Sequence, residues 1–256
     1  MIQLLHGDCL ELMKDIPDKS IDMILCDLPY GTTPLNWDSA LNMEELWKEY
    51  SRVVKPNGAI VLFGQEPFSS YVRISNIKQY RYDWYWEKER LTNVFQVKKR
   101  AGKTIENIMV FYKEQCTYNT QKNIHEGKRV TNKIGKNARW SVTQSGYEQT
   151  TKPFEYNDDG TRYPTQLLKF QRDNPRKRLH PTQKPISLLE YLIKTYTNEG
   201  ETVLDNCMGS GSTGVACVNL KRNFIGMELK EEYFKIAEER INNARLNQQT
   251  GGDGCD

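Results

Sequence analysis

The stretch CDLPYGTT, at residues 26–33, sets a carboxylate beside a rigid turn and an aromatic side chain. Asp27 can accept hydrogen bonds or a proton. Pro29 holds its φ angle near −65° and stiffens the turn, and Tyr30 is an aromatic group expected to be exposed next to the carboxylate. Because an apolar run begins at Ile21, we expect a buried strand to carry these groups to one end of a sheet.

A second stretch that could bind a ligand is VLDNCMGSGSTGVAC, residues 203–217, whose pattern predicts a strand, a glycine-rich turn and a helix. Gly209 and Gly211 permit a close backbone approach, and the helix start offers free amides. The spacing is neither G-x-G-x-x-G nor a phosphate-binding loop with its lysine. The next strand ends in Glu228, whose carboxylate can accept hydrogen bonds from ribose hydroxyls. Such a loop alone is as often a plain strand ending, but together with Asp27 it favours a site for an adenosine-containing cofactor.

The chain of 256 residues is long enough for one domain, or one domain with an insertion, around a sizeable core. It has no run of about 18 apolar residues, and its amino-terminal MIQLLHGDCLELMKD meets acidic residues too early for a signal peptide. We therefore expect a soluble cytoplasmic protein with no membrane segment. The six cysteines form no C-x-x-C pair and only three histidines are present, so neither a disulfide framework nor a metal site is indicated.

Positive charge is concentrated in the middle of the chain. Residues 114–178 contain 13 Lys or Arg against 7 Asp or Glu, whereas the whole chain carries only +3. The same segment has aromatic residues among many Asn, Gln and Thr and lacks a sustained apolar period. We interpret it as a loop-rich inserted module.

On either side of this module, short β-branched runs alternate with helical periodicity, as in an α/β protein with a mainly parallel sheet. The predicted strands are Ile2–Leu5, Ile21–Cys26, Ala59–Gly64, Tyr82–Glu87, Ile108–Tyr112, Thr202–Asp205 and Phe224–Glu228. The predicted helices are Met43–Val54, closed by KPNG, then Pro67–Asn76, Ile186–Thr197, Thr213–Leu220 and Glu231–Leu246. The chain opens with a strand but closes with a helix, which a circularly permuted sheet would explain.

With these elements in place, the motifs resemble the DNA amino-methyltransferases of the permuted β group, and most of all its phage and prophage members. The resemblance covers nearly the whole chain and rests on GDCLE at 7–11, DLPY at 27–30, NWD at 36–38, VLFG at 61–64, HPTQKP at 180–185 and DNCMGSGSTG at 205–214. It implies a Rossmann-like methyltransferase fold, with a mixed seven-stranded sheet between helices, and S-adenosyl-L-methionine as the cofactor. The implied domains are a catalytic half at 1–113, a target-recognition insert at 114–178, a cofactor-binding half at 179–247 and a disordered tail at 248–256.

The resemblance assigns the chemistry to the DLPY tetrapeptide. An exocyclic amine of a base is a poor nucleophile because its lone pair is delocalised into the ring, so hydrogen-bond acceptors must face its N–H groups. Asp27 is the implied side-chain acceptor and the carbonyl of Leu28 the main-chain one. Pro29 stiffens the turn, and Tyr30 stacks on a base flipped out of the duplex. Leu28 departs from the family pattern, which has proline there, and leaves the backbone more freedom.

The other implied site residues surround the cofactor. Asp8 and Cys9 match an acidic turn beside the adenine, although an Asp after a strand is as often a helix cap. Thr182, Gln183 and Lys184 match an element near the methionine end, where Lys184 could pair with the cofactor carboxylate. The remaining cofactor-binding candidates are Asp27, Asp205, Cys207, Gly209, Gly211, Thr213 and Glu228.

The basic insert is the expected DNA contact. The predicted phosphate-binding residues are Lys128, Arg129, Arg176, Lys177 and Arg178, while Asn, Gln and Arg side chains would read base edges. Adenine N6 is the expected target, because family members with Asp first in the tetrapeptide mostly modify adenine. The alternatives are cytosine N4, amino-methylation of RNA or of a protein glutamine, and a DNA-binding regulator without turnover. The resemblance leaves open a homodimer and a cognate restriction nuclease.

Overall fold

The computed structural model describes residues 1–30, 41–124, 139–143, 146–150, 160–172 and 183–250. The chain divides into two compact units, of which the larger comprises Met1–Asn119 with Thr165–Asp256 and the smaller Thr120–Pro164. The smaller unit begins and ends inside the predicted insert.

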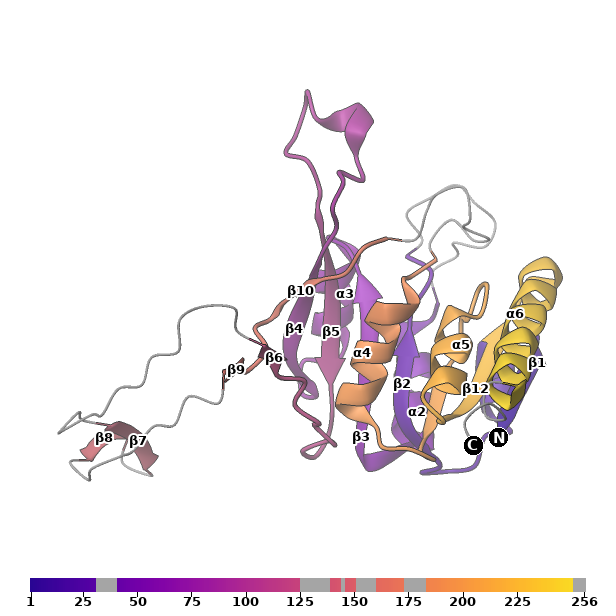
Figure 1. Cartoon of the computed structure of the whole chain (residues 1–256), viewed down its shortest axis with the longest axis horizontal. Helices are drawn as coiled ribbons and strands as arrows, with labels where there is room; N and C mark the ends of the chain where they lie inside the picture. Colours follow the sequence, from indigo (N-terminus) through magenta and orange to yellow (C-terminus); the bar gives the residue numbers. More distant parts are fainter. Residues whose placement is uncertain (31–40, 125–138, 144–145, 151–159, 173–182, 251–256) are drawn as a thin grey trace. The chain divides into compact units, whose positions relative to one another are not determined.

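The larger unit is built on one sheet with helices around it (Figure 1). The strands of the sheet are β1 (Ile2–His6), β2 (Ile21–Cys26), β3 (Val54–Gly64), β4 (Tyr80–Glu87), β5 (Ile105–Phe111), β10 (Leu167–Lys169), β11 (Thr202–Asp205) and β12 (Asn223–Glu228). The helices are α1 (Cys9–Met13), α2 (Met43–Val53), α3 (Phe68–Ser75), the 3₁₀ turn η1 (Val94–Gln96), α4 (Ile186–Tyr196), α5 (Ser212–Asn219) and α6 (Glu231–Thr250).

The strand order across this sheet is β1-β12-β11-β2-β3-β5-β4-β10. Only β5 is antiparallel to its neighbours, β3 and β4. The predicted α/β fold with a mainly parallel sheet is therefore confirmed. The eight strands are the seven predicted ones and β10, a short segment within the predicted insert that pairs with β4, with Leu168 opposite Trp86.

Three local predictions differ from the structure. The KPNG segment does not close α2 but belongs to β3, where Val54 pairs with Ile21. Gly58 is needed there, because a Cβ atom would lie 2.9 Å from the backbone oxygen of Asp22. The short helix α1 was not predicted. Helix α6 continues to Thr250, into the segment predicted to be a disordered tail.

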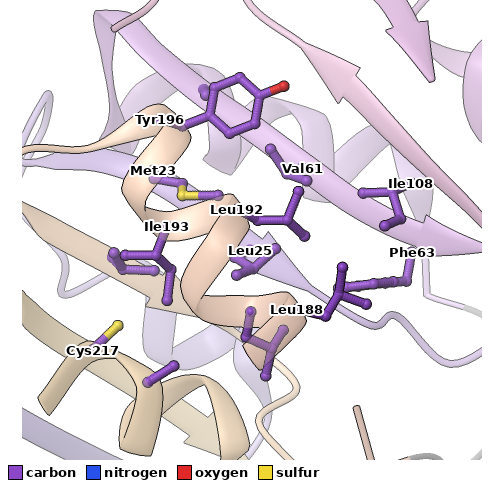
Figure 2. Packing of buried hydrophobic residues seen from close by; sticks show 14 of the residues in the cluster. Met23, Leu25, Val61, Phe63, Ile108, Leu188, Leu192, Ile193, Tyr196 and Cys217 are labelled. Carbon is purple, nitrogen blue, oxygen red and sulfur yellow. The ribbon is translucent and has the colours of Figure 1, made fainter. Parts of the chain in front are cut away.

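The apolar core lies in two layers, one on each face of the sheet. One layer packs α4, α5 and α6 against the sheet, with Leu192 and Ile193 of α4 over Met23 and Leu25 of β2 (Figure 2). The other packs α1, α2 and α3 against the opposite face. Strand β2 is buried on both sides, which explains why its sequence is a continuous apolar run rather than an alternating one.

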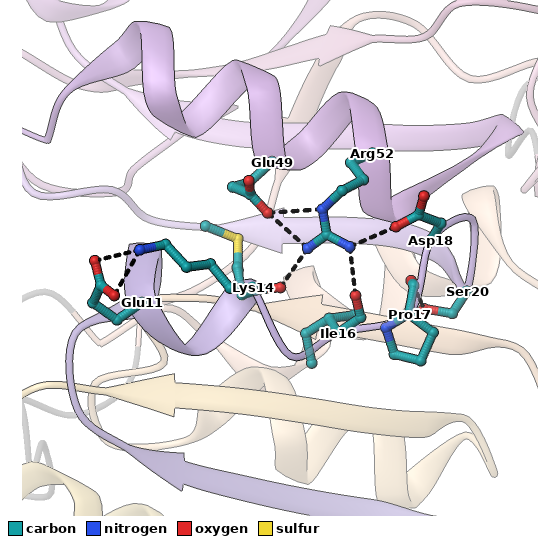
Figure 3. Close-up of polar contacts among 9 residues, drawn as sticks. Glu11, Lys14, Ile16, Pro17, Asp18, Ser20, Glu49 and Arg52 are labelled. Atoms are coloured by element: carbon teal, nitrogen blue, oxygen red, sulfur yellow. Dashed lines mark hydrogen bonds and ion pairs between the residues drawn. The ribbon is translucent and has the colours of Figure 1, made fainter.

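Arg52, at the end of α2, fixes the connection between α1 and β2. Its guanidinium donates to the carbonyls of Met13 and Ile16 and forms ion pairs with Asp18 and Glu49 (Figure 3). These contacts hold the start of β2, the strand that ends at the DLPY turn.

The smaller unit contains two two-stranded antiparallel sheets, which pair β6 (Asn123–Ile124) with β9 (Thr161–Arg162) and β7 (Arg139–Thr143) with β8 (Gly146–Thr150). Among the residues that the structure describes, no helix has the length and apolar character that crossing a bilayer requires.

Candidate active site at the switch point of the sheet

The loops that follow β2 and β11 lie at the same end of the sheet. These strands are parallel neighbours, with Val203 opposite Met23 and Leu204 opposite Ile24. Beyond β11 lie β12 and then β1, whereas beyond β2 lies β3, so the direction of winding reverses between β11 and β2. Sheets of this kind bind ligands at such a switch point, outside the carboxyl ends of the strands.

A cavity of about 220 Å³ occupies this position. The predicted site residues that line it are Asp8, Cys9, Asp27, Leu28, Pro29, Tyr30, Gln183, Lys184, Asp205, Cys207, Gly209, Thr213 and Glu228. Its wall also contains residues that the sequence did not single out, among them Gly7, Leu25, Asn206, Met208, Ser210, Leu229, Lys230 and Tyr233. The DLPY turn and the glycine loop therefore face one cavity.

Two side chains hold the carboxylate of Asp27 in place. The Tyr30 hydroxyl donates to Oδ1 at 2.8 Å, and the Lys184 ammonium donates to Oδ2 at 2.5 Å. The ring of Tyr30 stacks on Phe68, with 4.8 Å between centroids. Both oxygens of Asp27 are thus held by protein groups.

The Leu28 side chain is anchored in the core. It is only 3% exposed and belongs to the apolar layer formed with α1, α2 and α3. Burial of this side chain restrains the backbone at residue 28, where the family pattern has a proline.

Lys184 joins Asp27 to a second buried carboxylate. Its Nζ lies 2.9 Å from Oε1 of Glu106, on β5, and 4.9 Å from the centroid of Phe63. Glu106 also forms an ion pair with Lys88, the residue that follows β4. The resemblance implies that Lys184 pairs with the cofactor carboxylate, but here the ammonium is held between two carboxylates of the protein.

The pKa values of the two carboxyl groups differ because Asp27 pairs with one lysine, Lys184, whereas Glu106 pairs with both Lys184 and Lys88. Burial raises the pKa of Asp27 above its ordinary value, since Lys184 offsets burial only in part and Glu106 adds to it. Burial also acts to raise the pKa of Glu106, but Lys184 and Lys88 outweigh it, so that pKa is lowered. Burial acts to lower the pKa of Lys184, but the two carboxylates raise it. Asp27 is therefore the more basic carboxylate, facing an ammonium that stays charged.

Glu228 organises the glycine loop. Its Oε2 accepts from the amide of Gly209 at 2.9 Å, and its Oε1 accepts from the amide of Lys230 at 2.8 Å. Burial raises the pKa of this carboxyl group, although the amides oppose the shift. Gly209 has a φ angle of +51°, which glycine adopts without strain.

Asp205, the last residue of β11, also stabilises the glycine loop through hydrogen bonds. Its oxygens accept from the amide of Cys207 at 3.2 Å and from the Thr213 hydroxyl at 2.7 Å. Burial raises its pKa to about 6. The carboxyl group thus ties the strand end to the first turn of α5.

Gly211 does not line the cavity but brings α5 close to α6. Its φ angle is +76°, and a Cβ atom would lie 2.8 Å from Cβ of Ala237. The second glycine of the loop is therefore required by helix packing.

Arg240 of α6 is a loop-supporting residue that the sequence did not predict. Its guanidinium donates to the carbonyl and hydroxyl of Ser210 and to the hydroxyl of Ser212. Nothing in its local sequence marks it among the charged residues of that helix.

Asp8 has the capping role that the sequence allowed, and it also lines the cavity. Its Oδ1 accepts from the amides of Leu10 at 2.8 Å and Glu11 at 3.4 Å. Cys9 is buried, and its sulfur accepts from the side-chain amide of Asn206.

The predicted residues Thr182, Lys128, Arg129, Arg176, Lys177 and Arg178 lie outside the described residues.

A second cavity, of about 190 Å³, adjoins the first. The two share Tyr30, Gln183 and Lys184. The remaining lining of the second cavity is Gln65, Trp86, Lys88, Thr92, Glu106 and Arg172. The shared residues include both side chains that hold Asp27.

Residues 21–239 match the sequence profile of the N6_N4_Mtase family, described as DNA methylase. Among curated relatives, the Type II methyltransferase M.HpaI of Haemophilus parainfluenzae is 28% identical over 254 residues, which cover 93% of this chain and 74% of that protein. The DNA adenine methyltransferase YhdJ of Escherichia coli K12 is 28% identical over 257 residues, with coverages of 93% and 82%.

Solved structures show the same similarity. The M1.HpyAVI-SAM complex is 29% identical, with a TM-score of 0.62 and coverage of 94% of this chain and 100% of that one. The cytosine-N4-specific PvuII DNA methyltransferase is 18% identical, with a TM-score of 0.62 and coverages of 98% and 93%. At that identity the likeness is one of fold.

Proposed function

Because the chain belongs to the N6_N4_Mtase family of DNA methylases, we propose that it methylates the exocyclic amine of a base flipped out of DNA, and that this amine is adenine N6. The observation that carries the proposal is the shared cavity. A carboxylate with both oxygens fixed, Asp27, and a glycine-rich loop at Gly209 line the same space of about 220 Å³. A methyl transfer needs both substrates aligned within one such space.

The cofactor is S-adenosyl-L-methionine, which supplies a methyl group on a positively charged sulfonium. The cavity suits it, because acidic groups and apolar side chains line the same space, among them Asp8, Glu228, Leu229 and Tyr233. The carboxylate of Glu228 accepts from the amides of Gly209 and Lys230 and lines the cavity. We propose that this carboxylate also accepts from the ribose hydroxyls of the cofactor.

Asp27 is proposed to accept a hydrogen bond from the target amine, with the Leu28 carbonyl as the second acceptor. These acceptors favour the pyramidal amine, whose lone pair is localised and nucleophilic. The bound cofactor would supply the methyl group to this nitrogen, and the proton that the amine loses would pass to Asp27 and from there to solvent. The raised pKa of Asp27 suits this role, because a more basic carboxylate is the better acceptor.

The second cavity is the proposed place for the flipped base. It contains Tyr30, whose ring can contact the face of a base, and it reaches Asp27 through the shared Lys184.

The finer subgroup is also a proposal. If β11 is taken as the first strand, the order β1-β12-β11-β2-β3 becomes 3-2-1-4-5, the order of a doubly wound nucleotide-binding sheet. This supports a circularly permuted, β-group arrangement. The likeness to phage and prophage members and DNA contact by the basic insert stay predictions, while a homodimer and a cognate nuclease stay open.

Incubation with isotope-labelled S-adenosyl-L-methionine and, in parallel, duplex DNA, RNA and total protein tests the function. We expect label in DNA, and mass spectrometry of the digested DNA should show N6-methyladenine. N4-methylcytosine would correct the base, and label confined to RNA or protein would overturn the substrate. Single-molecule sequencing of DNA from expressing cells would give the sequence context.

Asp27→Ala should abolish transfer and leave cofactor binding, measured by calorimetry, largely intact. Asp15→Ala removes an exposed carboxylate and serves as the matched control. Full activity of Asp27→Ala would refute the assigned role.

A further inference from the structure

The connection between β4 and β5 extends beyond the sheet as a narrow protrusion (Figure 1). We name residues 88–104 the hairpin arm. Strand β4 runs parallel to β2, because β5 is antiparallel to both β3 and β4. The arm therefore rises from the end of the sheet that also carries the candidate active site.

The arm is an ordered structure. Asn93 bridges its two sides, donating to the carbonyl of Ala101 at 3.0 Å and accepting from the amide of Lys103 at 2.6 Å. The amide of Thr92 donates to the Lys103 carbonyl, and Leu91 fills the space that a Cβ on Gly102 would occupy. The tip is the 3₁₀ turn η1.

This ordered tip presents apolar side chains to solvent. Phe95 is fully exposed, and Val94 and Val97 are 59% and 44% exposed. Single exposed apolar residues are common on proteins, but here three adjoin one another on a protrusion. Such a group indicates a contact with another molecule.

The charge around the tip identifies the partner. Residues 89–104 contain five basic residues, Arg90, Lys98, Lys99, Arg100 and Lys103, against the single acid Glu89. This excess suits a polyanion. An apolar tip flanked by cations is the combination with which proteins insert a side chain between base steps while neighbouring cations bind phosphates.

The base of the arm belongs to the second cavity. Lys88 and Thr92 both line that cavity, and Lys88 forms an ion pair with Glu106. The arm thus begins where the flipped base is proposed to bind.

From these contacts we infer that the hairpin arm is a DNA wedge, in which Phe95 enters the base stack beside the flipped nucleotide and Lys98, Lys99 and Arg100 hold the phosphates. The inference rests on the proposed function, because it needs DNA as the substrate. An aromatic side chain in the stack replaces contacts that the duplex loses when a base leaves it.

The test compares Phe95→Ala with the wild type on two duplexes that contain the methylation site, one fully paired and one with a mismatch at the target base. We expect Phe95→Ala to bind the paired duplex about 10- to 100-fold more weakly. The mismatch should restore most of this loss, since an unpaired base costs less to extrude. Ile77→Ala is the control, because Ile77 is 62% exposed but lies before β4, at the opposite end of the sheet.

A second variant, with Lys98, Lys99 and Arg100 all changed to Ala, separates charge from insertion. In a plot of the logarithm of the association constant against the logarithm of the salt concentration, it should make the negative slope shallower by about 2–3, or about 0.9 for each lost phosphate contact. Phe95→Ala should leave that slope unchanged.

Wild-type affinity of Phe95→Ala for both duplexes would overturn the inference. So would an equal loss on both, which would make Phe95 a contact without a wedge role. Dissociation of a dimer with unchanged DNA affinity would assign the arm to self-association. Failure of the wild type to methylate any DNA would instead refute the proposed function, so the two failures are distinguishable.

Discussion

Lys184→Met removes the cation that holds Asp27 and should suppress methyl transfer near neutral pH. At a separation of 2.5 Å, Coulomb's law with an effective dielectric constant of about 20 gives an attraction on the order of 6–7 kcal/mol. Much of this offsets the cost of burying both charges, and deleting one partner of such a pair costs about 3–5 kcal/mol. Asp27 can avoid that cost by taking up a proton.

A protonated Asp27 presents one acceptor fewer to the amine, so activity should follow the ionised fraction. Because 1.36 kcal/mol corresponds to a factor of ten, the cost of about 3–5 kcal/mol lowers the ionised fraction on the acidic limb by about 10²–10⁴. A group whose folded pKa is raised loses its proton at higher pH. The acidic limb of kcat against pH should therefore move to higher pH in Lys184→Met.

Glu106→Gln should move the same limb in the opposite direction. The charge of Glu106 raises the pKa of Asp27 and competes for Lys184. Its removal therefore favours ionised Asp27 at lower pH. Lys55→Met is the matched control, since it deletes a 2.6 Å ion pair with Asp22 outside the site.

The assay is the pH dependence of kcat and of KM for the cofactor, measured for each variant on the same DNA. Shifts in the same direction for Lys184→Met and Glu106→Gln would refute the electrostatic argument. A raised KM for the cofactor with an unmoved acidic limb would show that Lys184 binds the cofactor carboxylate instead, as the resemblance to the family implies.

Two further predictions concern stability. Gly211→Ala should lower the free energy of unfolding by about 2–4 kcal/mol, because the site has a φ angle of +76° and the new Cβ meets Ala237. The control is Gly200→Ala, at a φ angle of +80° with no atom within 4 Å, which should cost only the backbone strain. Equal losses of stability in urea unfolding would contradict a steric clash at Gly211. For Asp205, burial raises the pKa to about 6. The protonated carboxyl group therefore stabilises the fold fully below about pH 4, and this stabilisation is lost as the pH rises through about 6. The wild type minus Asp205→Asn difference in unfolding free energy should thus be larger at pH 4 than at pH 7.5, by about 3 kcal/mol at most, and a pH-independent difference would contradict it.

The sheet could be predicted from sequence where its strands carry a strong local signal. Strand β2 is a continuous apolar run, and the glycine loop after β11 has a recognisable strand, turn and helix pattern. Strand β10 has no such signal, because its three residues become a strand only through pairing with β4. The local sequence KPNG predicts the end of a helix, but pairing with β2 makes it part of β3.

Some residues of the candidate site could likewise be predicted from the sequence, and others could not. Its turns follow strands, and parallel strands bring their carboxyl ends together, so the DLPY turn and the glycine loop could be predicted to meet. Glu106 could not, because it is the second residue of β5, with no motif around it, and only the pairing of β4, β5 and β3 brings it to Lys184. Arg240 was missed for the same reason.

Leu28 shows how a departure from a family pattern can keep its physical purpose. A proline restrains the backbone through its ring, whereas Leu28 is held by a side chain only 3% exposed among apolar neighbours. Fully burying a leucine is worth about 1.5–3 kcal/mol, and turning its carbonyl out of position would expose part of that surface. Meanwhile the adjoining carboxylate is fixed from two sides, by Tyr30 and Lys184. In the proposed mechanism, the two acceptors would therefore be held by burial of Leu28 and by the contacts of Asp27, without the ring of a proline.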